Sequence, residues 1–498
     1  MDPAKSGMDI VIVSTVNAEQ EAYWQERLEK SRGQVLKNSA LFIVILEDWQ
    51  GGAGNGLGSL YAYQKAREKA FIEHKIDIFQ KQREGYSIAL YHTAGEGKRL
   101  YPLTASEFGN KSAIKLPSLI KIDDMDEPIT ILEAVIRQTG IYANARRGRL
   151  SVFWADQLFV PATAPEIPSR HHADLLVKLI PMPTEDEWQQ KELHKYGLIT
   201  LNKDGKAQHI EKSDYKTIKR LISEGTISIS GGVGVSLGSF SLSTPFTFAL
   251  LQEFQPELIQ KNNKMDSDPY FWMPLTLDQK SYIEMFGRDR ADEAKNHYLR
   301  MQYFKNHFLN KHPETNLFGI VDIGVGGFWW DLGTIDSYFN NLMKLTQNTV
   351  EGYLLRELFR LEQNHEQIIL NSQIGKGKIV SSIVVGTCAE ELNVEHSIII
   401  NSTFKVMRAS HSLFYNVFEE EPLAFKENTV RADTYLPSKE QHIKIYAERT
   451  QDSKKLWSTH LPNNQLSYES IAQELRSESS KEGIAEFKKL RSQQPLNS

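Results

Sequence analysis

A glycine-rich, cationic turn at residues 93–99 has the residue types needed to hold a phosphate. An apolar run of strand length, residues 88–91, leads into this turn, which reads Thr-Ala-Gly-Glu-Gly-Lys-Arg. Gly95 and Gly97 carry no Cβ, so the backbone N–H groups around them can approach an anionic ligand closely. Arg99 can bind a phosphate through two parallel hydrogen bonds. A surface turn with scattered charges is the alternative.

Further residues around the turn favour the phosphate interpretation. The segment 100–104, Leu-Tyr-Pro-Leu-Thr, stops any long helix after it, because proline is not tolerated in a helix interior. Lys111 and Lys115 then bring two more cations back toward the same place. The combination of a strand, Gly-x-Gly-Lys-Arg-Leu-x-Pro-Leu-Thr and returning lysines is much more specific than a lone Gly-x-Gly.

This stretch resembles the signature loop of sugar-1-phosphate nucleotidyltransferases, whose usual form is GGxGTRLxPLT followed by a lysine. Two positions depart from that form: Ala94 replaces the first glycine and Lys98 replaces the threonine. The resemblance implies that the loop and its arginine hold the phosphates of a nucleoside triphosphate. The residues it implies are Gly95, Glu96, Gly97, Lys98 and Arg99, with Lys111 as the catalytic lysine and Lys115 as a second candidate.

Length and composition limit the class of protein. The chain has 498 residues, which exceeds one ordinary core, so we expect two or three domains. Its 40% hydrophobic and 24% charged residues are typical of soluble proteins. The net charge of −5 argues against nucleic acid as its main partner. One cysteine, Cys388, excludes an intramolecular disulfide and a multi-cysteine zinc site. No signal peptide or membrane-spanning run is apparent, so we expect a cytoplasmic protein without a membrane partner.

The first third of the chain alternates strands and helices. Residues 9–14 and 41–46 are apolar runs that predict buried strands, and Asn17 is a plausible N-cap for a helix to about Lys30. A long helix to about Lys81 is expected after the second strand. This rhythm predicts an α/β fold with a doubly wound, mostly parallel sheet, in which ligands gather at the carboxyl ends of the strands. The resemblance implies the GT-A-like form of this sheet.

A second glycine-rich turn, residues 51–58, opens that long helix. Taken alone, a flexible connector explains it equally well. Together with the signature loop, it predicts a share in nucleotide binding for Gly56, Gly58 and Ser59, with the turn as reader of the base edge. The opening strand-helix unit, the GxGNGxxSL element and GNKSAIKLP make the chain most similar to fucose-1-phosphate guanylyltransferases (GDP-fucose pyrophosphorylases). This closer likeness covers roughly the first third of the chain.

Two aspartates follow or end predicted strands. Asp156 comes just after the strand at 150–154, where it could also cap a turn, and Asp331 lies in Phe-Trp-Trp-Asp-Leu-Gly-Thr. VFWADQLF and FWWDLGT, with Tyr338 following, resemble the family's two Mg²⁺-binding motifs. The resemblance therefore implies Mg²⁺ bound by Asp156 and Asp331. Two carboxylates so far apart in sequence can share one ion only if both lie in one cleft.

A predicted hairpin over residues 196–211 ends in Glu211-Lys212-Ser213. An exposed Glu-Lys pair at a strand end is the alternative. The hairpin resembles the family's YGxxxxDxxGxVxxxxEKP, although Ser213 replaces the proline. The resemblance implies that Glu211 contacts sugar hydroxyls and that Lys212 orients the sugar phosphate. Gly238 would let a sugar lie against backbone, but the asparagine of the family's NxGxYxF strand is absent here.

The domain boundaries follow changes in composition. We expect a catalytic domain over 1–350, with a helical insertion at about 250–316 whose aromatic cluster, residues 270–272, packs on the domain or on a partner subunit. Short β runs with an irregular repeat over 366–436 predict a β-solenoid-like domain, and an antiparallel sandwich is the alternative. The polar, partly helical segment 437–498 either packs on the solenoid or mediates homo-oligomerisation.

The implied reaction joins a nucleoside triphosphate and a sugar 1-phosphate into an NDP-sugar and pyrophosphate. GTP and a fucose-1-phosphate-like sugar are the first expectation, and a UTP-dependent uridylyltransferase is the alternative. An NDP-sugar-dependent glycosyltransferase of the same fold would carry a DxD motif, whose letters occur at Asp266 and Asp268. A non-catalytic NDP-sugar-binding protein is a further alternative, supported by the departures at Ala94, Lys98 and Ser213.

Overall fold

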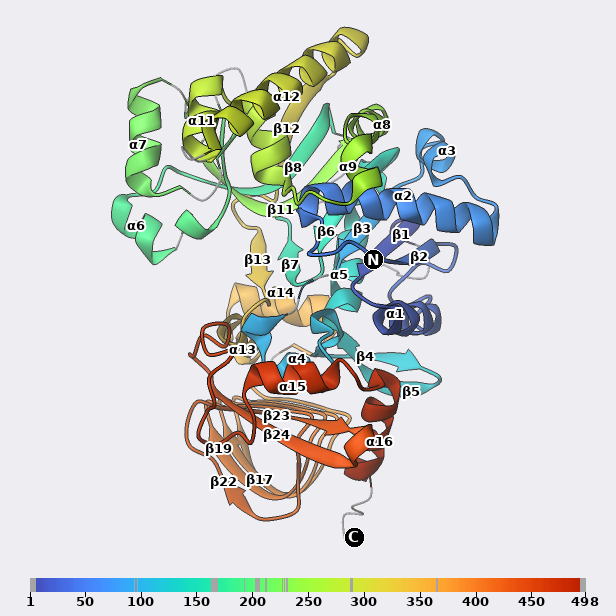
Figure 1. Cartoon of the computed structure of the whole chain (residues 1–498). Helices are drawn as coiled ribbons and strands as arrows, with labels where there is room; N and C mark the ends of the chain where they lie inside the picture. The colour runs from blue at the N-terminus through green and yellow to red at the C-terminus, as the bar shows by residue number, and fades with distance from the viewer. Residues whose placement is uncertain are drawn as a thin grey trace.

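The chain has an upper α/β part and a lower strand-rich part in the view of Figure 1. The computed structural model describes residues 6–93, 95, 97–162, 169–191, 193–201, 207–210, 213–225, 227, 229, 232–286, 290–363 and 366–492. The fold is mixed α/β, with mostly parallel sheets and many short strands near the C-terminus. Among the described helices, none combines the length and the apolar character needed to span a membrane.

Four parallel strands form one half of the upper sheet. They are β1 (Ile10–Thr15), β2 (Leu41–Leu46), β3 (Ile88–His92) and β6 (Arg149–Trp154). β1 lies between β2 and β3, and β3 pairs with β6. All six residues of β1 are buried, because its side chains alternate between two hydrophobic clusters, one on each face of the sheet. The carboxyl ends of the four strands therefore share one edge, as the sequence predicts.

Helices cover both faces of this half. α1 (Ala18–Lys30) begins at Asn17, whose side chain accepts a hydrogen bond from the Gln20 N–H at 2.8 Å, as expected for an N-cap. α2 (Gly54–His74) covers the opposite face. The predicted single helix to about Lys81 is wrong. Lys75 takes a left-handed φ of 58° that ends α2, and Asp77 caps a separate helix, α3 (Ile78–Arg83).

The other half of the sheet is mixed. Its strands are β8 (His171–Ile180), β9 (Leu198–Leu201), β10 (Ala207–Ile210), β11 (Val233–Ser243) and β12 (Asn316–Asp322). β11 runs antiparallel to β6, β8 and β9, while β12 is parallel to β8. The predicted hairpin corresponds to β9 and β10, which pair antiparallel. Two short helices, α6 (Glu185–Gln190) and α7 (Tyr215–Ser223), flank this half.

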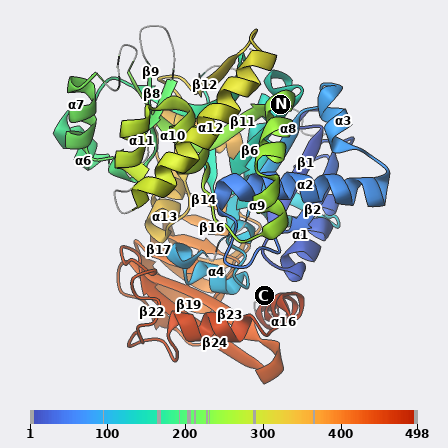
Figure 2. The same ribbon diagram turned by 45° about the horizontal axis from the view of Figure 1, so that its top comes forward.

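The predicted helical insertion packs on the sheet. It contains α8 (Thr244–Glu253), α9 (Gln255–Gln260), a π-helical turn (Asp268–Trp272), α10 (Met273–Thr276), α11 (Gln279–Phe286) and α12 (Ala291–Lys311). Figure 2 shows α10 and α12 in front of the strands. Trp272 contacts Phe240 of β11 with ring centroids 5.2 Å apart, and Phe308 contacts Phe246 at 5.0 Å. The aromatic cluster is therefore core.

A layer of short elements lies between the two parts. It contains α4 (Leu103–Ser106), β4 (Lys115–Ile122), β5 (Met125–Thr130), α5 (Ile131–Thr139), β7 (Gln157–Val160), β13 (Phe328–Asp331), α13 (Ile335–Met343) and α14 (Val350–Phe359). β7 and β13 pair antiparallel below the sheet (Figure 1). This two-stranded ladder brings the two predicted metal ligands together.

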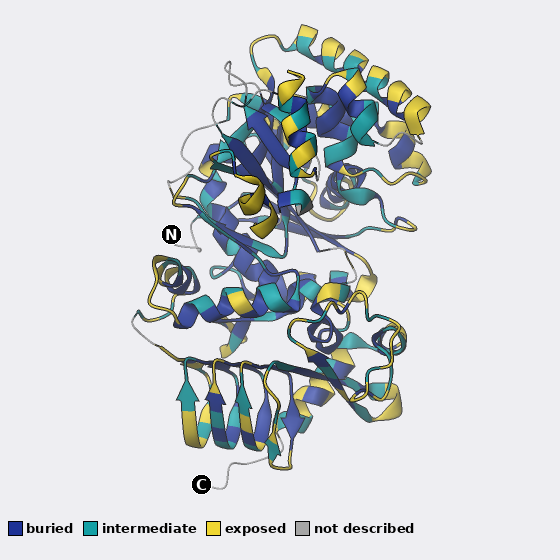
Figure 3. Cartoon of the chain, turned by 90° about the vertical axis from the view of Figure 1, so that its left-hand side faces the viewer, coloured by how far each residue is buried: buried dark blue, intermediate teal, exposed yellow. Residues whose placement is uncertain are grey.

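The C-terminal strands stack as parallel coils. They are β14 (Ile368–Leu370), β15 (Gln373–Val380), β16 (Ile383–Val385), β17 (Cys388–Glu395), β18 (Ile398–Ile400), β19 (Thr403–Ser410), β20 (Leu413–Tyr415), β21 (Phe418–Glu419), β22 (Leu423–Ala424), β23 (Thr429–Leu436) and β24 (Gln441–Glu448). Successive coils pair in parallel (Figure 3), which favours the predicted solenoid over the sandwich. Only the last pair, β23 with β24, is antiparallel, so the strands continue past the predicted boundary at 436.

The repeat of these coils is regular, although it looks irregular in the sequence. The Ser397 N–H donates to Ser382 Oγ, and the Ser412 N–H donates to Ser397 Oγ, each across 15 residues. One corner of each coil has a left-handed backbone, at Asn371, Gly386, Asn401 and Asn416 in turn. Asparagine and glycine both adopt this conformation readily, so residue identity varies while the geometry repeats.

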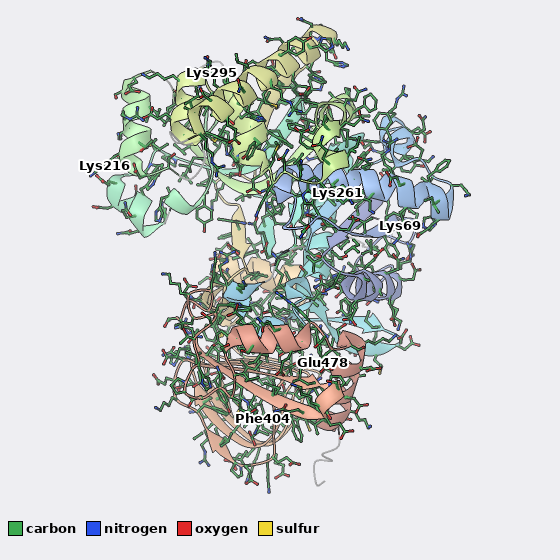
Figure 4. The ribbon with its side chains drawn as sticks, in the orientation of Figure 1. Lys69, Lys216, Lys261, Lys295, Phe404 and Glu478 are labelled. Carbon is green, nitrogen blue, oxygen red and sulfur yellow. The ribbon has the colours of Figure 1, made fainter. Side chains whose placement is uncertain are left out.

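The C-terminal segment returns to the α/β part. α15 (Tyr468–Leu475) lies beside α4 (Figure 1), and α16 (Ser480–Ser492) packs its Gly483 against the Phe108 ring. Within the segment, Glu478, labelled in Figure 4, accepts the Ser438 N–H at 3.0 Å. One hydrophobic cluster runs from Val11 in the sheet to Ile398 in the coils. The Thr403 hydroxyl of β19 donates to the Arg491 carbonyl of α16 at 3.2 Å, so the segment contacts the coils as well as the α/β part.

Candidate active site

The cationic turn folds around one lysine. It follows His92, the last residue of β3, and continues into a short 3₁₀ helix, Lys98–Leu100. Gly97 has φ 59°, and a Cβ there would lie 2.7 Å from the Thr104 side chain and 3.0 Å from Lys111 Cβ, so only glycine fits. A Cβ on Gly95 would lie 3.8 Å from Lys111 Nζ. Gly95 and Gly97 therefore both lie against the Lys111 side chain.

Asp156 and Asp331 converge on Gly333. Asp156 follows β6, its carbonyl accepts the Leu332 N–H at 2.8 Å, and Asp331 ends β13 next to it. A Cβ placed on Gly333 would lie 2.9 Å from Asp331 Oδ1, 3.3 Å from Arg99 Nη2 and 3.5 Å from Asp156 Oδ2. Three charged side chains from three distant segments thus surround the bare face of one glycine.

The two carboxylates are electrostatically unequal. Lys111 Nζ lies 2.9 Å from Asp156 Oδ2. Burial alone would raise the pKa of Asp156, but Lys111, with Arg99 adding to it, brings that pKa below its usual value. The pKa of Asp331 is raised, first by burial and then by the charge of Asp156, although the Gly333 N–H donates to its Oδ1 at 2.7 Å. Lys111 therefore pairs with Asp156, while at Asp331 the charges of Arg99 and Lys111 are outweighed by burial and by Asp156.

The residues present fit a magnesium ion. Within the described ranges, no three His, Cys, Asp or Glu side chains gather into a metal-binding group. Mg²⁺, however, is usually held by one or two carboxylates together with substrate phosphates. Asp156 and Asp331 offer the oxygen ligands, and a cation held by both would offset the repulsion by which Asp156 raises the pKa of Asp331.

Lys115 does not join this group, which corrects its proposed role as a second phosphate ligand. Its Nζ lies 3.2 Å from Glu107 and donates to the Ala113 carbonyl at 2.7 Å. Tyr415 of β20 donates to the same Glu107. Lys115 therefore belongs to a buried ion pair at the junction with the coils. Proximity in sequence to Lys111 misleads here, because Lys115 begins a strand that leads away from the turn.

Lys98 also turns toward the C-terminal segment. Its Nζ lies 4.8 Å from the centroid of the Trp457 ring, a cation–π contact. Close by, the Ser453 hydroxyl donates to the Tyr101 carbonyl at 2.8 Å, and Tyr101 contacts Trp457 edge to face. Lys98 thus connects the cationic turn to the segment that follows the coils.

The second glycine-rich turn is engaged in packing. Gly56, Gly58 and Ser59 are all buried, and the N–H groups of Gly56 and Leu57 both donate to the Met265 carbonyl, at 3.0 and 3.2 Å. A Cβ on Gly56 would lie 2.9 Å from that carbonyl oxygen. Gly56 allows a close approach of the chain at Met265, whereas Gly58 lies against Glu47. The share of Gly56, Gly58 and Ser59 in nucleotide binding stays a prediction.

Gly238 lies against the Trp154 indole, where the sequence predicted a sugar. It has φ 74°, and a Cβ there would lie 2.2 Å from Trp154 Nε1. The Trp154 indole stacks on the His92 ring with centroids 5.2 Å apart. The face that Gly238 was expected to offer to a sugar is thus occupied by Trp154.

His92 and Trp154 form a layer beneath the site that the sequence motifs do not reveal. His92 hydrogen-bonds with the side chains of Ser14 and Ser59, at 3.0 and 2.8 Å. Burial, aided by the charge of Lys111, lowers the pKa of His92 to about 4, so the ring is neutral at pH 7. One signal could have found both residues: each is the last residue of a parallel strand at the carboxyl edge of the sheet.

No family model and no curated protein matches this chain. The assignment of the site therefore depends on the geometry above. Of the predicted site residues, Arg99, Lys111, Asp156 and Asp331 lie together around Gly333 and the turn of Gly95 and Gly97. Three predicted residues, Glu96, Glu211 and Lys212, lie outside the described residues.

Proposed function

We propose that the chain is a sugar-1-phosphate nucleotidyltransferase. Its reaction would join a nucleoside triphosphate and a sugar 1-phosphate into an NDP-sugar and release pyrophosphate. The observation that carries this proposal is the convergence of Arg99, Lys111, Asp156 and Asp331 at the carboxyl edge of the sheet. Both substrates are polyanions, so the site must neutralise charge while it aligns them, and two cations beside two possible metal ligands are suited to this.

Each side chain has a distinct role in this mechanism. Arg99 and Lys111 would hold the phosphates of the departing pyrophosphate, and Lys212 would orient the attacking sugar phosphate. Asp156 and Asp331 would hold Mg²⁺, which when bound supplies charge neutralisation at the reacting phosphate. No general base is required, because a phosphate monoester is already ionised near neutral pH. The state of His92 is consistent with a mechanism that uses no general base, because its ring is neutral and is hydrogen-bonded to the side chains of two serines.

GTP and a fucose-1-phosphate-like sugar remain the first substrates to test. This choice depends on the likeness of the first third of the chain to fucose-1-phosphate guanylyltransferases. The second turn gives this choice no additional support, because the N–H groups of Gly56 and Leu57 already donate to the Met265 carbonyl. A UTP-dependent uridylyltransferase is the alternative within the same reaction class.

A substrate matrix tests the proposal. Purified protein with Mg²⁺ is incubated with GTP, UTP or ATP against fucose, glucose and mannose 1-phosphates, and pyrophosphate release is measured. We expect release with at least one pair and its loss in Asp156→Asn. If pyrophosphate is released far more efficiently with UTP than with GTP, the proposed specificity for GTP is wrong, but the proposed reaction class is retained. Absence of pyrophosphate from every pair would overturn the proposal.

The glycosyltransferase alternative has less support. The DxD letters are engaged within the protein: Asp266 accepts the Asn55 N–H at 2.9 Å, and Asp268 lies 3.3 Å from His209. Transfer of sugar from a pre-made NDP-sugar, independent of pyrophosphate, would favour that alternative. A non-catalytic protein would bind the NDP-sugar at equilibrium without turnover of any substrate pair.

A further inference from the structure

A cavity of about 370 Å³ lies at the edge of the sheet opposite the candidate active site. Its walls come from the residues before β1 and β2, the end of α5, the end of β7 and the last turns of α14. Most of this lining is apolar, with Met8, Val35, Ile141, Val160 and Leu354 as examples. Such a volume, apolar with a few polar groups, is typical of sites for small organic ligands.

One buried amide lines this cavity without a partner. Gln138, in the last turn of α5, is 3% exposed, and neither its Oε1 nor its Nε2 has a hydrogen-bond partner among the described residues. Buried polar groups are nearly always hydrogen-bonded, because an unsatisfied donor or acceptor costs about 1–3 kcal/mol. Both amide atoms are themselves buried, so Gln138 belongs to the closed wall of the cavity.

Two arginines that form no ion pair among the described residues line the same cavity. Arg137 donates to the Leu358 carbonyl at 3.0 Å, and within the described ranges neither Arg137 nor Arg360 forms an ion pair. Glu357 also lines the cavity but pairs with neither arginine, and Lys37 is paired with Asp9. Burial, and then the charge of Arg360, lowers the pKa of Arg137 to about 10. Two like charges beside each other are unfavourable, and an anion between them would relieve their repulsion.

We propose that this cavity binds a small amphipathic anion. Its apolar body would fill the space between α5 and α14, and its anionic end would contact Arg137 and Arg360. The carboxylate and the phosphate monoester are the two head groups that arginine recognises best. The site is separate from the proposed nucleotidyltransferase function, because none of the active-site residues lines the cavity.

Calorimetric titration of the full chain with four probes tests this site. Octanoate and octyl phosphate carry an apolar body with each head group, octan-1-ol carries the body alone, and inorganic phosphate carries charge alone. We expect saturable 1:1 binding of octanoate or octyl phosphate, at least tenfold tighter than that of octan-1-ol or inorganic phosphate. The tighter of the two identifies the head group. No saturable binding of either anion would overturn the proposal.

Two variants locate the binding. Arg137→Gln removes the charge, and Leu354→Trp fills the cavity, so each should weaken binding of the tighter probe at least tenfold. Arg408→Gln is the matched control, because Arg408 lies on the coils with its side chain 64% exposed. Thermal unfolding verifies that each variant is folded. Unchanged affinity in the variants of Arg137 and Leu354 that fold would show that the probe binds elsewhere and would overturn the proposal, whether or not pyrophosphate is released in the substrate matrix.

Discussion

Asp156 and Asp331 face the same glycine, and the charge of Asp156 raises the pKa of Asp331. The two residues reach this position by different routes, one at the end of the parallel strand β6 and the other at the end of β13. Lys111 pairs with Asp156, and its effect on the pKa of Asp331 is smaller than the effects of burial and of Asp156. The site is therefore destabilised by one ionised carboxylate, a property that a bound cation would relieve.

Asp331→Asn should stabilise the protein at pH 7 and remove its proposed activity. A raised folded-state pKa means that the folded protein disfavours the ionised form of the carboxyl group. Ionised Asp331 therefore lowers the stability of the fold above that pKa. The penalty disappears as pH falls through the folded pKa, and the gain from the substitution should disappear with it. Thermal unfolding at pH 7 and pH 4 measures this, and pyrophosphate release should fall about 100-fold or more. A lower melting temperature at pH 7 would contradict this prediction.

Asp156→Asn should have the opposite effect on stability. Its folded-state pKa is lowered, so the ionised carboxylate contributes stability above the unfolded pKa, and this contribution is lost as pH falls through the folded pKa. At pH 7 the substitution leaves Lys111 without its partner, and the melting temperature should decrease. Pyrophosphate release should decrease by a similar factor to that in Asp331→Asn. Equal shifts in melting temperature for the two variants would show that the carboxylates are equivalent.

Magnesium should stabilise the wild-type protein in the absence of nucleotide. A ligand that binds only the folded state adds about 2.7 kcal/mol at a concentration of 100 times its Kd. The increase in melting temperature should be largely lost in Asp331→Asn, which keeps the shape of the site but not its charge. Addition of a chelator should reverse the increase. The same Mg²⁺ response in wild type and variant would exclude Asp331 as a ligand.

Gly333→Ala should disrupt the site while leaving the fold intact. The new Cβ would lie 2.9 Å from Asp331 Oδ1 and 3.3 Å from Arg99 Nη2, so both side chains must move away. Gly333 has no left-handed φ, so the backbone itself accepts alanine. Pyrophosphate release should fall at least about tenfold, as positional shifts near reacting groups do. Gly326→Ala in the same region is the control, because its Cβ would meet only the Ala162 methyl, at an ordinary 3.5 Å.

The two lysines after the turn should differ in their effect on activity. Lys111→Gln should reduce pyrophosphate release by about 100-fold, since Lys111 contacts the site, and should also lower the free energy of unfolding, since Asp156 loses its cation. Lys115→Met should lower the free energy of unfolding by about 3–5 kcal/mol, because Glu107 would remain buried without its cation, and should leave the activity of the folded protein unchanged. Activity and chemical unfolding of both variants are compared. If the Lys115→Met variant is stable but loses activity, Lys115 contributes to phosphate binding as the sequence predicted.

Local rules suffice for several features of this chain. The continuous apolar run of β1 predicts a strand buried on both faces, and the type of residue at Asn17 predicts the start of α1, because each depends only on near neighbours in sequence. Asp156 is found in the same way, as an acidic residue just past a strand, whereas Asp331 is found through the resemblance of FWWDLGT to a family motif.

Tertiary structure alone decides which glycines and lysines belong to the site. Gly56 and Gly238 have the composition of ligand-binding positions, but Met265 and Trp154 occupy the space beside them. Lys111 and Lys115 are near neighbours, yet one contacts Asp156 and the other Glu107. The sequence by itself determined the strands, the caps and the residue types. Packing between distant segments determined which of those residues meet, because a glycine or a lysine has the same local preferences whatever lies across the space from it.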